Sequence, residues 1–273
     1  MGAGHREGAK VTAEAVERTQ VGPLLAQWRR RRGVSQLELS HLAGVSARHV
    51  GFVETGRSQP SREMVLRLAE HLDVPPRERN ALLLAAGYAP VYHEKPLDDP
   101  AMRPVLDAVR RVLRGHHPYP AVVMDGRRDV IASNEPFDRL FTEGVAAHLL
   151  RPPVNVLRLA LHPDGMAPRI VNLGRWRGKL LTGLARRSAL DGNLRPLYEE
   201  LLGYPCEQPV PEADIPGPDE IMLPLELRCG ERVLSFLATF TTFGTARDLT
   251  SSELIIESFF PADDDTAAYL SGS

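Results

Sequence analysis

Apolar side chains recur at helical spacing through the first third of the chain, and the pattern predicts five short helices between residues 21 and 90. Two of them lie within SQLELSHLAGVSARHVGFVETGR, residues 35–57, where an apolar stripe on one helix is followed by a glycine and by valines that bury the next helix. The positions are Leu39 and Ala43, then Gly44, then Val45, Val50 and Val53. This spacing predicts a helix-turn-helix.

Polar residues mark where these helices begin. Ser35 and Glu38, three residues later, form a capping box, and Ser46 is placed to cap the second helix of the pair. Three more helices are expected. The first begins at about Pro23 and ends before Gly33, the second begins after the capping residue Ser61, and the third extends from about Glu78 to Ala86. Together the five helices predict a compact all-α domain.

From about residue 99 onward the pattern changes to a mixture of helices and strands. An amphipathic helix precedes two short strands, AVVMD and RDVIASN, which flank a turn at Gly126 and lead into another short helix. Leucine-rich segments at helical spacing fill the region between Leu157 and Leu202.

Alternating apolar residues return near the end of the chain and predict two strands joined by a tight hairpin at Gly230 and Glu231. Pro224 cannot donate a hydrogen bond to a neighbouring strand, so its strand belongs near a sheet edge. The run ELIIESFF fits a third strand. The predicted fold class is therefore an all-α helix-turn-helix domain of five helices followed by an α+β domain with an antiparallel sheet.

The chain is expected to divide at changes in this pattern. The predicted parts are a mobile N-terminal arm over 1–20, the helix-turn-helix domain over 21–90, a proline-containing linker over 91–98, the α+β domain over 99–265 and a C-terminal tail over 266–273.

The composition is that of a globular protein with two domains, since 43% of the 273 residues are hydrophobic and 25% are charged. No apolar run approaches the roughly 18 residues of a membrane span, and the polar start MGAGHREGAK lacks the apolar core of a signal peptide. A cytoplasmic protein without membrane contact is expected. Cys206 and Cys229 lack metal-ligand spacing, so we expect ordinary thiols, no metal site and no cofactor.

The net charge of −2 conceals an asymmetry between the two domains. Residues 21–90 hold 10 Lys and Arg against 6 Asp and Glu, whereas residues 91–273 hold 20 against 26. The basic surplus lies where the helix-turn-helix lies, and there it suits contact with phosphates.

Two resemblances to known families narrow the interpretation. SQLELSHLAGVS and VETGRSQPS resemble the repressor-type helix-turn-helix of Xre-family regulators. Further on, separated phrases resemble the ligand-binding domain of MmyB-like transcription regulators, and these are PAVVMDGRRDVIASNEPFDRLF, PPVNVLRLALHPDGMAPRIVNLGRW and TFGTARDLTSSELIIESFFPAD. Together the resemblances cover nearly everything from Pro23 to Asp265.

These resemblances imply a DNA-binding transcriptional regulator whose PAS-like C-terminal domain binds a small apolar ligand in a buried pocket. A fatty acid is the ligand type associated with that family. The resemblance also implies an ion pair between Arg29 and Glu54 and a phosphate contact from Gln36. Because one such module buries little surface on DNA, we expect a homodimer on half-sites about one helical turn apart.

The second helix of the pair carries side chains that suit the major groove of double-stranded DNA. Arg48 is the main candidate, because an arginine can bind guanine through two hydrogen bonds. Ala47 and Phe52 can contact thymine methyl groups, and Arg57 can meet the phosphate backbone. The predicted DNA-binding residues are Gln36, Ser46, Ala47, Arg48, His49, Phe52 and Arg57.

A pocket for an acyl chain needs apolar walls and one polar anchor. The wall candidates are Met124, Phe137, Trp176, Phe236 and Phe240, and the simpler interpretation of any single one of them is an ordinary core residue. Arg158, His162 and Arg169 can meet a carboxylate by charge-assisted hydrogen bonds, or can serve as surface or structural residues.

Two other functions stay open from the sequence alone. One is a regulator controlled by a protein partner, with a C-terminal domain whose pocket is filled by its own side chains. The other is an enzyme carrying a DNA-binding domain, with chemistry at His116, His117 or His162. No H-E-x-x-H, G-x-S-x-G or phosphate-binding glycine loop supports the second, so no catalytic residue is assigned and no enzyme is expected.

Overall fold

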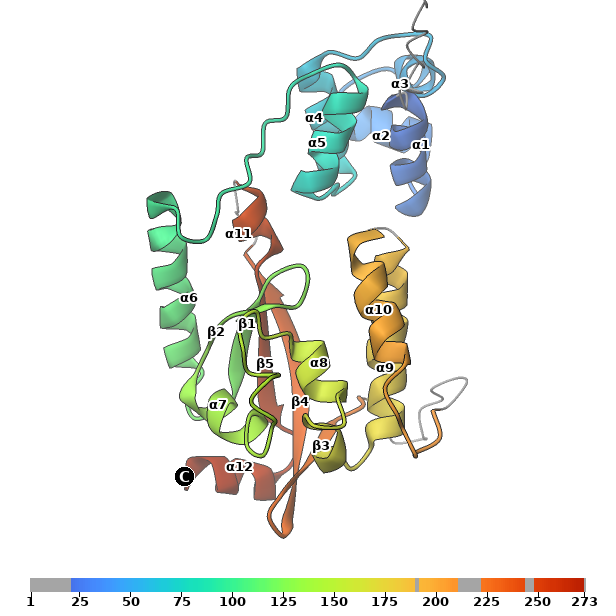
Figure 1. Ribbon diagram of the computed structural model, residues 1–273. Coiled ribbons are helices and arrows are strands. Elements are labelled where there is room, and N and C mark those ends of the chain that lie inside the picture. Colours follow the sequence, from blue (N-terminus) through green and yellow to red (C-terminus); the bar gives the residue numbers. More distant parts are fainter. Residues whose placement is uncertain (1–20, 190–191, 211–221, 244–247, 273) are drawn as a thin grey trace, which may run out of the picture. The chain divides into compact units, whose positions relative to one another are not determined.

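The computed structural model describes residues 21–189, 192–210, 222–243 and 248–272 of the chain. The chain divides into two compact units, Met1–His93 and Glu94–Ser273. The first is helical, and the second combines helices with one sheet (Figure 1). The arm expected over residues 1–20 lies outside the described residues.

The first unit contains, over its described residues, the five predicted helices around one apolar core. Their bounds are α1 Val21–Arg31, α2 Gln36–Ala43, α3 Ala47–Glu54, α4 Arg62–His71 and α5 Pro76–Ala85. The predicted apolar positions Leu39, Ala43, Val50 and Val53 are all buried in that core. Helix α5 begins two residues before the predicted start, because Pro76 takes the first helical position, where a missing N–H costs nothing.

The three predicted serine caps are confirmed. The hydroxyl groups of Ser35, Ser46 and Ser61 each accept a hydrogen bond from the main-chain N–H three residues later, at 3.0 to 3.2 Å. Gly44 turns the chain between α2 and α3 at a φ of +65°, a conformation that side chains disfavour.

Gly22 allows α1 to approach the end of α3 closely. A Cβ atom at this position would lie 2.4 Å from the carbonyl oxygen of Val53 and 2.6 Å from that of Glu54, both in the main chain. Any larger residue would therefore push the two helices apart.

Over its described residues, the second unit combines helical segments with strands. The helical segments are η1 Pro100–Met102, α6 Arg103–Gly115, α7 Glu135–Phe141, α8 Val156–Leu161, η2 Ala167–Arg169, α9 Leu173–Ser188, η3 Gly192–Leu194, α10 Arg195–Leu202, α11 Leu249–Glu253 and α12 Asp264–Ser271. The strands are β1 Ala121–Met124, β2 Val130–Ser133, β3 Leu225–Cys229, β4 Arg232–Thr242 and β5 Ile255–Pro261.

The described strands form one antiparallel sheet in the order β2-β1-β5-β4-β3. Strand β5 is therefore central, although it comes last in the sequence. Pro224 directly precedes β3, which lies at an edge as predicted. The predicted hairpin is confirmed by the pairing of Cys229 with Arg232 across Gly230, whose φ is +60°.

Helices cover both faces of the sheet (Figure 1). On one face, Val109 and Leu113 of α6 pack against Val123 of β1 and Ile256 of β5. On the other face, a larger core joins the sheet to α7, α8, η2, α9 and α12. Helices α8, α9 and α10 share a separate leucine-rich core.

Both outer edges of the sheet carry a further stretch of chain. Beside β2, the N–H of Val130 donates to the carbonyl of Val154, and the N–H of Val156 donates to the carbonyl of Arg128. Beside β3, the N–H of Val171 donates to the carbonyl of Glu226 at 2.8 Å. Side chains reinforce these contacts: Asn155 donates to Arg127 O and Asp129 Oδ1, and Asn172 donates to Pro224 O.

Two segments differ from the sequence prediction. Helix α12 stands where a tail was expected over 266–273, because the Asp263 side chain caps Thr266 N at 2.7 Å and Leu270 is fully buried. Part of the expected linker 91–98 is held on α5, where Asn80 Oδ1 accepts from the N–H groups of Val91 and Tyr92. Among the described helices, none is long and apolar enough to cross a membrane.

Candidate functional site

Helix α3 exposes a basic and aromatic face. Arg48 is exposed, Ala47, His49 and Phe52 are half-buried, and Ser46 caps the helix from its N-terminal end. Arg48 Cζ lies 5.1 Å from the centre of the Phe52 ring. Cation–π attraction therefore favours an ordered Arg48 side chain on this face.

Arg57, beyond the end of α3, approaches the same ring, with its Cζ 6.0 Å from the Phe52 centroid. The structure thus brings together three of the predicted DNA-binding residues, Arg48, Phe52 and Arg57, on one side of the helix-turn-helix.

Glu54, the last residue of α3, connects this helix to α1 and α2 by hydrogen bonds. Arg29 donates to it from Nε at 2.6 Å and from Nη2 at 3.0 Å, and Gln36 Nε2 donates at 2.7 Å. Burial raises the pKa of Glu54, but hydrogen bonds from Arg29 and Gln36 outweigh burial and hold the pKa below its ordinary value. The ion pair between Arg29 and Glu54 expected from the family is confirmed.

Gln36 therefore has a structural contact that the sequence analysis did not foresee. An amide nitrogen carries two donors, and the second is still available for a phosphate after one has gone to Glu54. The phosphate contact predicted for Gln36 stays a prediction.

A large groove opens in the second unit along one side of α9. Its volume is about 1000 Å³, and it is bordered by α8, α9, α10 and residues of β4 and β5. A smaller cavity of about 50 Å³ lies next to it in the core, with walls that include Phe141, Leu159 and Phe259. Val156, Leu157, Leu180 and Glu257 border both spaces, so the two adjoin.

The predicted wall residues divide between these spaces and the core. Phe137 and Trp176 border the smaller cavity, and Phe240 borders the groove, where it is 56% exposed. Met124 and Phe236 are fully buried in the core and border neither space.

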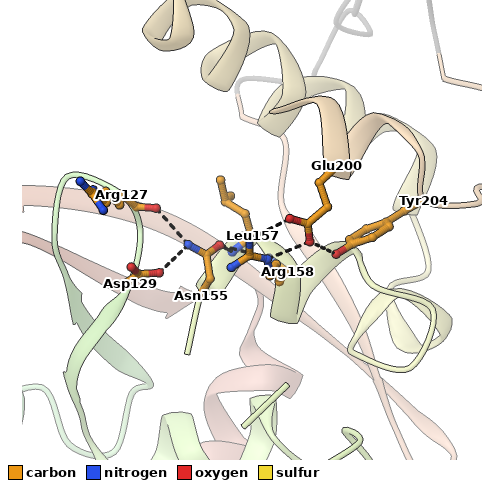
Figure 2. A network of polar contacts seen from close by, with 7 residues as sticks. All are labelled: Arg127, Asp129, Asn155, Leu157, Arg158, Glu200 and Tyr204. Atoms are coloured by element: carbon orange, nitrogen blue, oxygen red, sulfur yellow. Dashed lines mark hydrogen bonds and ion pairs between the residues drawn. The ribbon is translucent and has the colours of Figure 1, made fainter. Parts of the chain in front are cut away.

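Arg158, a predicted anchor, borders neither space. Figure 2 shows it in contact with Glu200 instead. Its Nε and Nη2 atoms donate to the two carboxylate oxygens of Glu200 on α10 at 2.8 and 2.7 Å, and Tyr204 Oη donates to the same carboxylate. Burial, followed by the hydrogen bond to Glu200, raises the pKa of Tyr204 to about 12. This contact joins α8 to α10.

The other two predicted anchors also have structural contacts and border neither space. Arg169 donates to the carbonyl groups of Leu140, Glu143 and Arg228. His162 Nδ1 accepts from the main-chain N–H of Asp164 at 3.0 Å, and its ring packs against Tyr204.

One group of side chains among the described residues has metal-ligand character. His148, His162 and Asp164 offer ligand atoms that all lie within 4.8 Å of one another. His162 Nδ1 and Asp164 Oδ2 are 3.9 Å apart, wider than the separation of about 3.4 Å that tetrahedral zinc with bonds of about 2.1 Å requires. The same imidazole nitrogen already accepts a main-chain hydrogen bond, so Nδ1 of His162 is not available to bind a metal in this arrangement.

Glu257 is a candidate functional residue that the sequence analysis missed. It lies in the central strand β5, its side chain borders both the groove and the smaller cavity, and it is only 8% exposed. Among the described residues, none donates a hydrogen bond to its carboxyl group or forms an ion pair with it. Burial raises the pKa of Glu257 to about 7, although the positive charge of Arg128 opposes the rise.

The sequence did carry a signal for Glu257, because this second glutamate of ELIIESFF is a charged residue directly after two isoleucines and shortly before two phenylalanines. A charged residue on a central strand with helices on both faces is costly to bury, so its presence there points to a functional role.

Two family models match the chain. The model described as "MmyB-like transcription regulator ligand binding domain" matches residues 105–271, and the model described as "Helix-turn-helix domain" matches residues 20–82. No curated protein matches the chain.

Several solved structures are similar to parts of the chain. The restriction-modification controller protein C.AhdI from Aeromonas hydrophila is 37% identical, over 23% of this chain and 94% of that one, with a TM-score of 0.22. The clp gene regulator ClgR from Corynebacterium glutamicum is 24% identical, over 37% of this chain and 94% of that one, with a TM-score of 0.23. An RNA-binding light-oxygen-voltage receptor is 13% identical, over 91% of this chain and 65% of that one, with a TM-score of 0.26.

The MmyB-like match extends over more than half of the chain and contains all five strands of the sheet, the groove and the smaller cavity. The helix-turn-helix match contains α3 and the Arg29–Glu54 ion pair. The chain therefore belongs to the MmyB-like transcription regulators, and it is a DNA-binding helix-turn-helix regulator with an MmyB-like ligand-binding domain.

Proposed function

We propose that this regulator reads a specific DNA sequence with α3 and that occupation of the groove in its second unit by a small apolar ligand changes its affinity for DNA. The observation that carries the proposal is the groove of about 1000 Å³ in a chain that also presents a DNA-reading helix. The five-stranded antiparallel sheet with helices on both faces is compatible with a PAS-like sensory domain.

The DNA contact is supported by the composition of the exposed face of α3. A recognition helix enters the major groove with the side chains of its first turns, and Arg48 and His49 lie there beside the capping residue Ser46. Arg57 lies beyond the helix end, where contact with a phosphate would position the protein without reading sequence. A homodimer on two half-sites is part of this proposal, since one module of this size buries little surface on DNA.

The ligand contact is supported by the size and lining of the groove. Pockets for small molecules have volumes of about 300 to 1000 Å³ and are mainly apolar with a few polar groups. Here the apolar lining includes Leu157, Leu181 and Leu184. A fatty acid, the ligand type that the family resemblance implies, fits this combination, and the proposal includes no catalytic step.

Two measurements on the full chain test the proposal. Mass spectrometry of the gently unfolded protein identifies any lipid that copurifies with it, and selection of binding sites from random duplexes identifies the operator. Repeating the selection with and without a saturated fatty acid tests the coupling between the two sites. A protein that selects no sequence refutes the DNA part, and operator affinity that does not depend on ligand refutes the sensor part in favour of control by a protein partner.

The position of Arg158 gives a prediction about the ligand site. Arg158→Ala is expected to change the affinity for a fatty acid by less than about twofold, because the side chain borders neither space. It should lower the free energy of unfolding by at most about 1 kcal/mol, since this pair is more than one-third exposed. Calorimetric titration and urea denaturation measure the two quantities. A weaker affinity for the acid with no change for the matching alcohol would make Arg158 an anchor after all.

A further inference from the structure

We infer that Arg128 and Glu257 form the head-group site of the groove, that together they select an amphipathic carboxylic acid, and that the acid is bound together with one proton held on Glu257. This inference rests on the proposed ligand-sensing function and adds the residues that recognise the polar end of the ligand and the dependence of its binding on pH.

Glu257 points toward the cavity side of the sheet. Alternate residues of β5 face the same way, and Ile255 and Phe259, two positions before and after it, both belong to the core on that side. The carboxyl group is therefore placed among apolar side chains, at the point where the groove meets the smaller cavity. A buried polar group without a protein partner costs stability, and a ligand that accepts a hydrogen bond from it removes that cost.

Arg128 borders the same groove, and its main chain has an unusual conformation. Its φ is +72°, a left-handed value that is unfavourable for a residue with a side chain. The turn is held by Asp125, whose Oδ1 accepts from the N–H groups of Arg127 and Asp129 at 2.8 and 2.9 Å. The Arg128 guanidinium then lies 5.3 Å from the centre of the Phe240 ring, on the wall of the groove.

The charges around the groove disfavour a cationic ligand. From α9, which packs across from β5, the cations that border the groove are Arg175, Arg177, Lys179, Arg186 and Arg187, and from α10 the titratable residue is Tyr198. Helix α8 and strand β4 contribute only apolar side chains to this border, namely Val156, Leu157 and Phe240. A ligand with an anionic head and an apolar body matches both the cations and the apolar walls.

A neutral Glu257 and a charged Arg128 offer a carboxylate two kinds of donor, one O–H and several N–H groups. An ionised Glu257 would instead repel the ligand. Because the anion makes ionisation of Glu257 still less favourable, its pKa is higher with ligand bound than without, and binding takes up a proton. The pKa of Glu257 in the free protein is about 7. The affinity for the acid is therefore greatest below pH 7 and falls by up to about tenfold per pH unit above it.

Isothermal titration calorimetry of the full chain with decanoate and with decanol tests this inference. For the wild-type protein, we expect the dissociation constant of decanoate to rise about tenfold between pH 8 and pH 9 and that of decanol to stay constant. Titrations at pH 8 in buffers of different ionisation enthalpy should show uptake of about one proton with decanoate and none with decanol. This measurement needs no variant, so it does not depend on whether a substitution is tolerated.

Two variants assign the effect to residues. Glu257→Gln, which keeps the shape and a donor, should remove proton uptake and flatten the pH dependence. Arg128→Met should weaken decanoate about tenfold or more and decanol by less than twofold, because a charge-assisted hydrogen bond is lost. The matched controls are Glu226→Gln on β3 and Arg158→Ala on α8, neither of which borders the groove.

The outcomes separate this inference from the proposed function. If decanoate and decanol bind alike and without proton uptake, the head-group site is wrong and the sensing function stands. If Glu257→Gln keeps the full pH dependence, the proton is not on Glu257 and the inference is overturned. If neither compound binds at any pH, both the inference and the proposed apolar ligand are overturned.

Discussion

Replacement of Glu54 by alanine should lower the free energy of unfolding of the N-terminal unit by about 3 kcal/mol. The side chains of Arg29 and Glu54 are only 14% and 6% exposed, so removal of the carboxylate leaves a buried guanidinium without its counter-charge. Loss of one partner from a buried ion pair costs about 3 to 5 kcal/mol. Gln36 loses its acceptor in the same step.

Hydrogen exchange in α1 and α3 of the full chain measures this change without interference from the second unit. Glu70→Ala on α4 is the matched control, because Glu70 is exposed, and we expect a change within about 0.5 kcal/mol there. A Glu54→Ala protein with wild-type protection in α1 and α3 would show that the ion pair contributes nothing. The double variant Arg29→Met with Glu54→Leu should recover most of the loss, since no charge is then left buried.

The contribution of Glu54 also depends on pH in a defined direction. Because the folded state lowers its pKa below 4.5, the carboxylate stabilises the unit above about pH 4.5, and this stability is lost as the pH falls through the folded pKa. The difference between wild type and Glu54→Ala should therefore shrink in acid.

Arg48→Ala should weaken binding to the selected operator by about 10- to 100-fold, which corresponds to the 1 to 3 kcal/mol of a bidentate contact with guanine. The same variant should bind unrelated duplex DNA with little change, because non-specific affinity comes from phosphate contacts. Competition titrations at one fixed salt concentration measure both affinities. The exposed position of Arg48 on α3 means that the substitution leaves the fold intact.

Arg57→Ala and Arg77→Ala complete this experiment. Arg57→Ala should weaken operator and unrelated DNA by similar factors and reduce the salt dependence, as expected for a phosphate contact. Arg77 is an exposed arginine on α5, and its replacement should change neither affinity. If Arg48→Ala weakens both kinds of DNA equally, Arg48 binds the backbone and does not read the sequence.

The helix-turn-helix was predictable because its determinants are local. Serine caps, a glycine at the turn and apolar residues three and four apart fix where α2 and α3 begin and how they cross, and all of these lie within about twenty residues of sequence. The strands and the hairpin at Gly230 were predictable for the same reason, since alternation and turn residues are read from neighbours. Helix α12 was missed because it is short and its burial depends on contacts with distant strands.

The sequence said less about the ligand site, because the role of each residue there depends on contacts with residues far away in the sequence. Arg158 is an ordinary exposed arginine until α10 brings Glu200 to it from 42 residues away. Glu257 was passed over because ELIIESFF was taken as a whole for a strand, while the importance of one residue depends on which strand is central. That order is set by pairing between β1 and β5, which are separated by more than one hundred residues.

The covered edges of the sheet limit how copies of this protein can associate. An exposed edge strand offers free N–H and C=O groups on which another chain can build a continuous sheet, which is a common route to aggregation and to strand exchange. Here residues 154–156 occupy that position beside β2, and residues 170–172 occupy it beside β3. At these positions no further strand can pair, so association of copies there depends on side-chain surfaces, which single substitutions can disrupt, and not on extension of the backbone ladder.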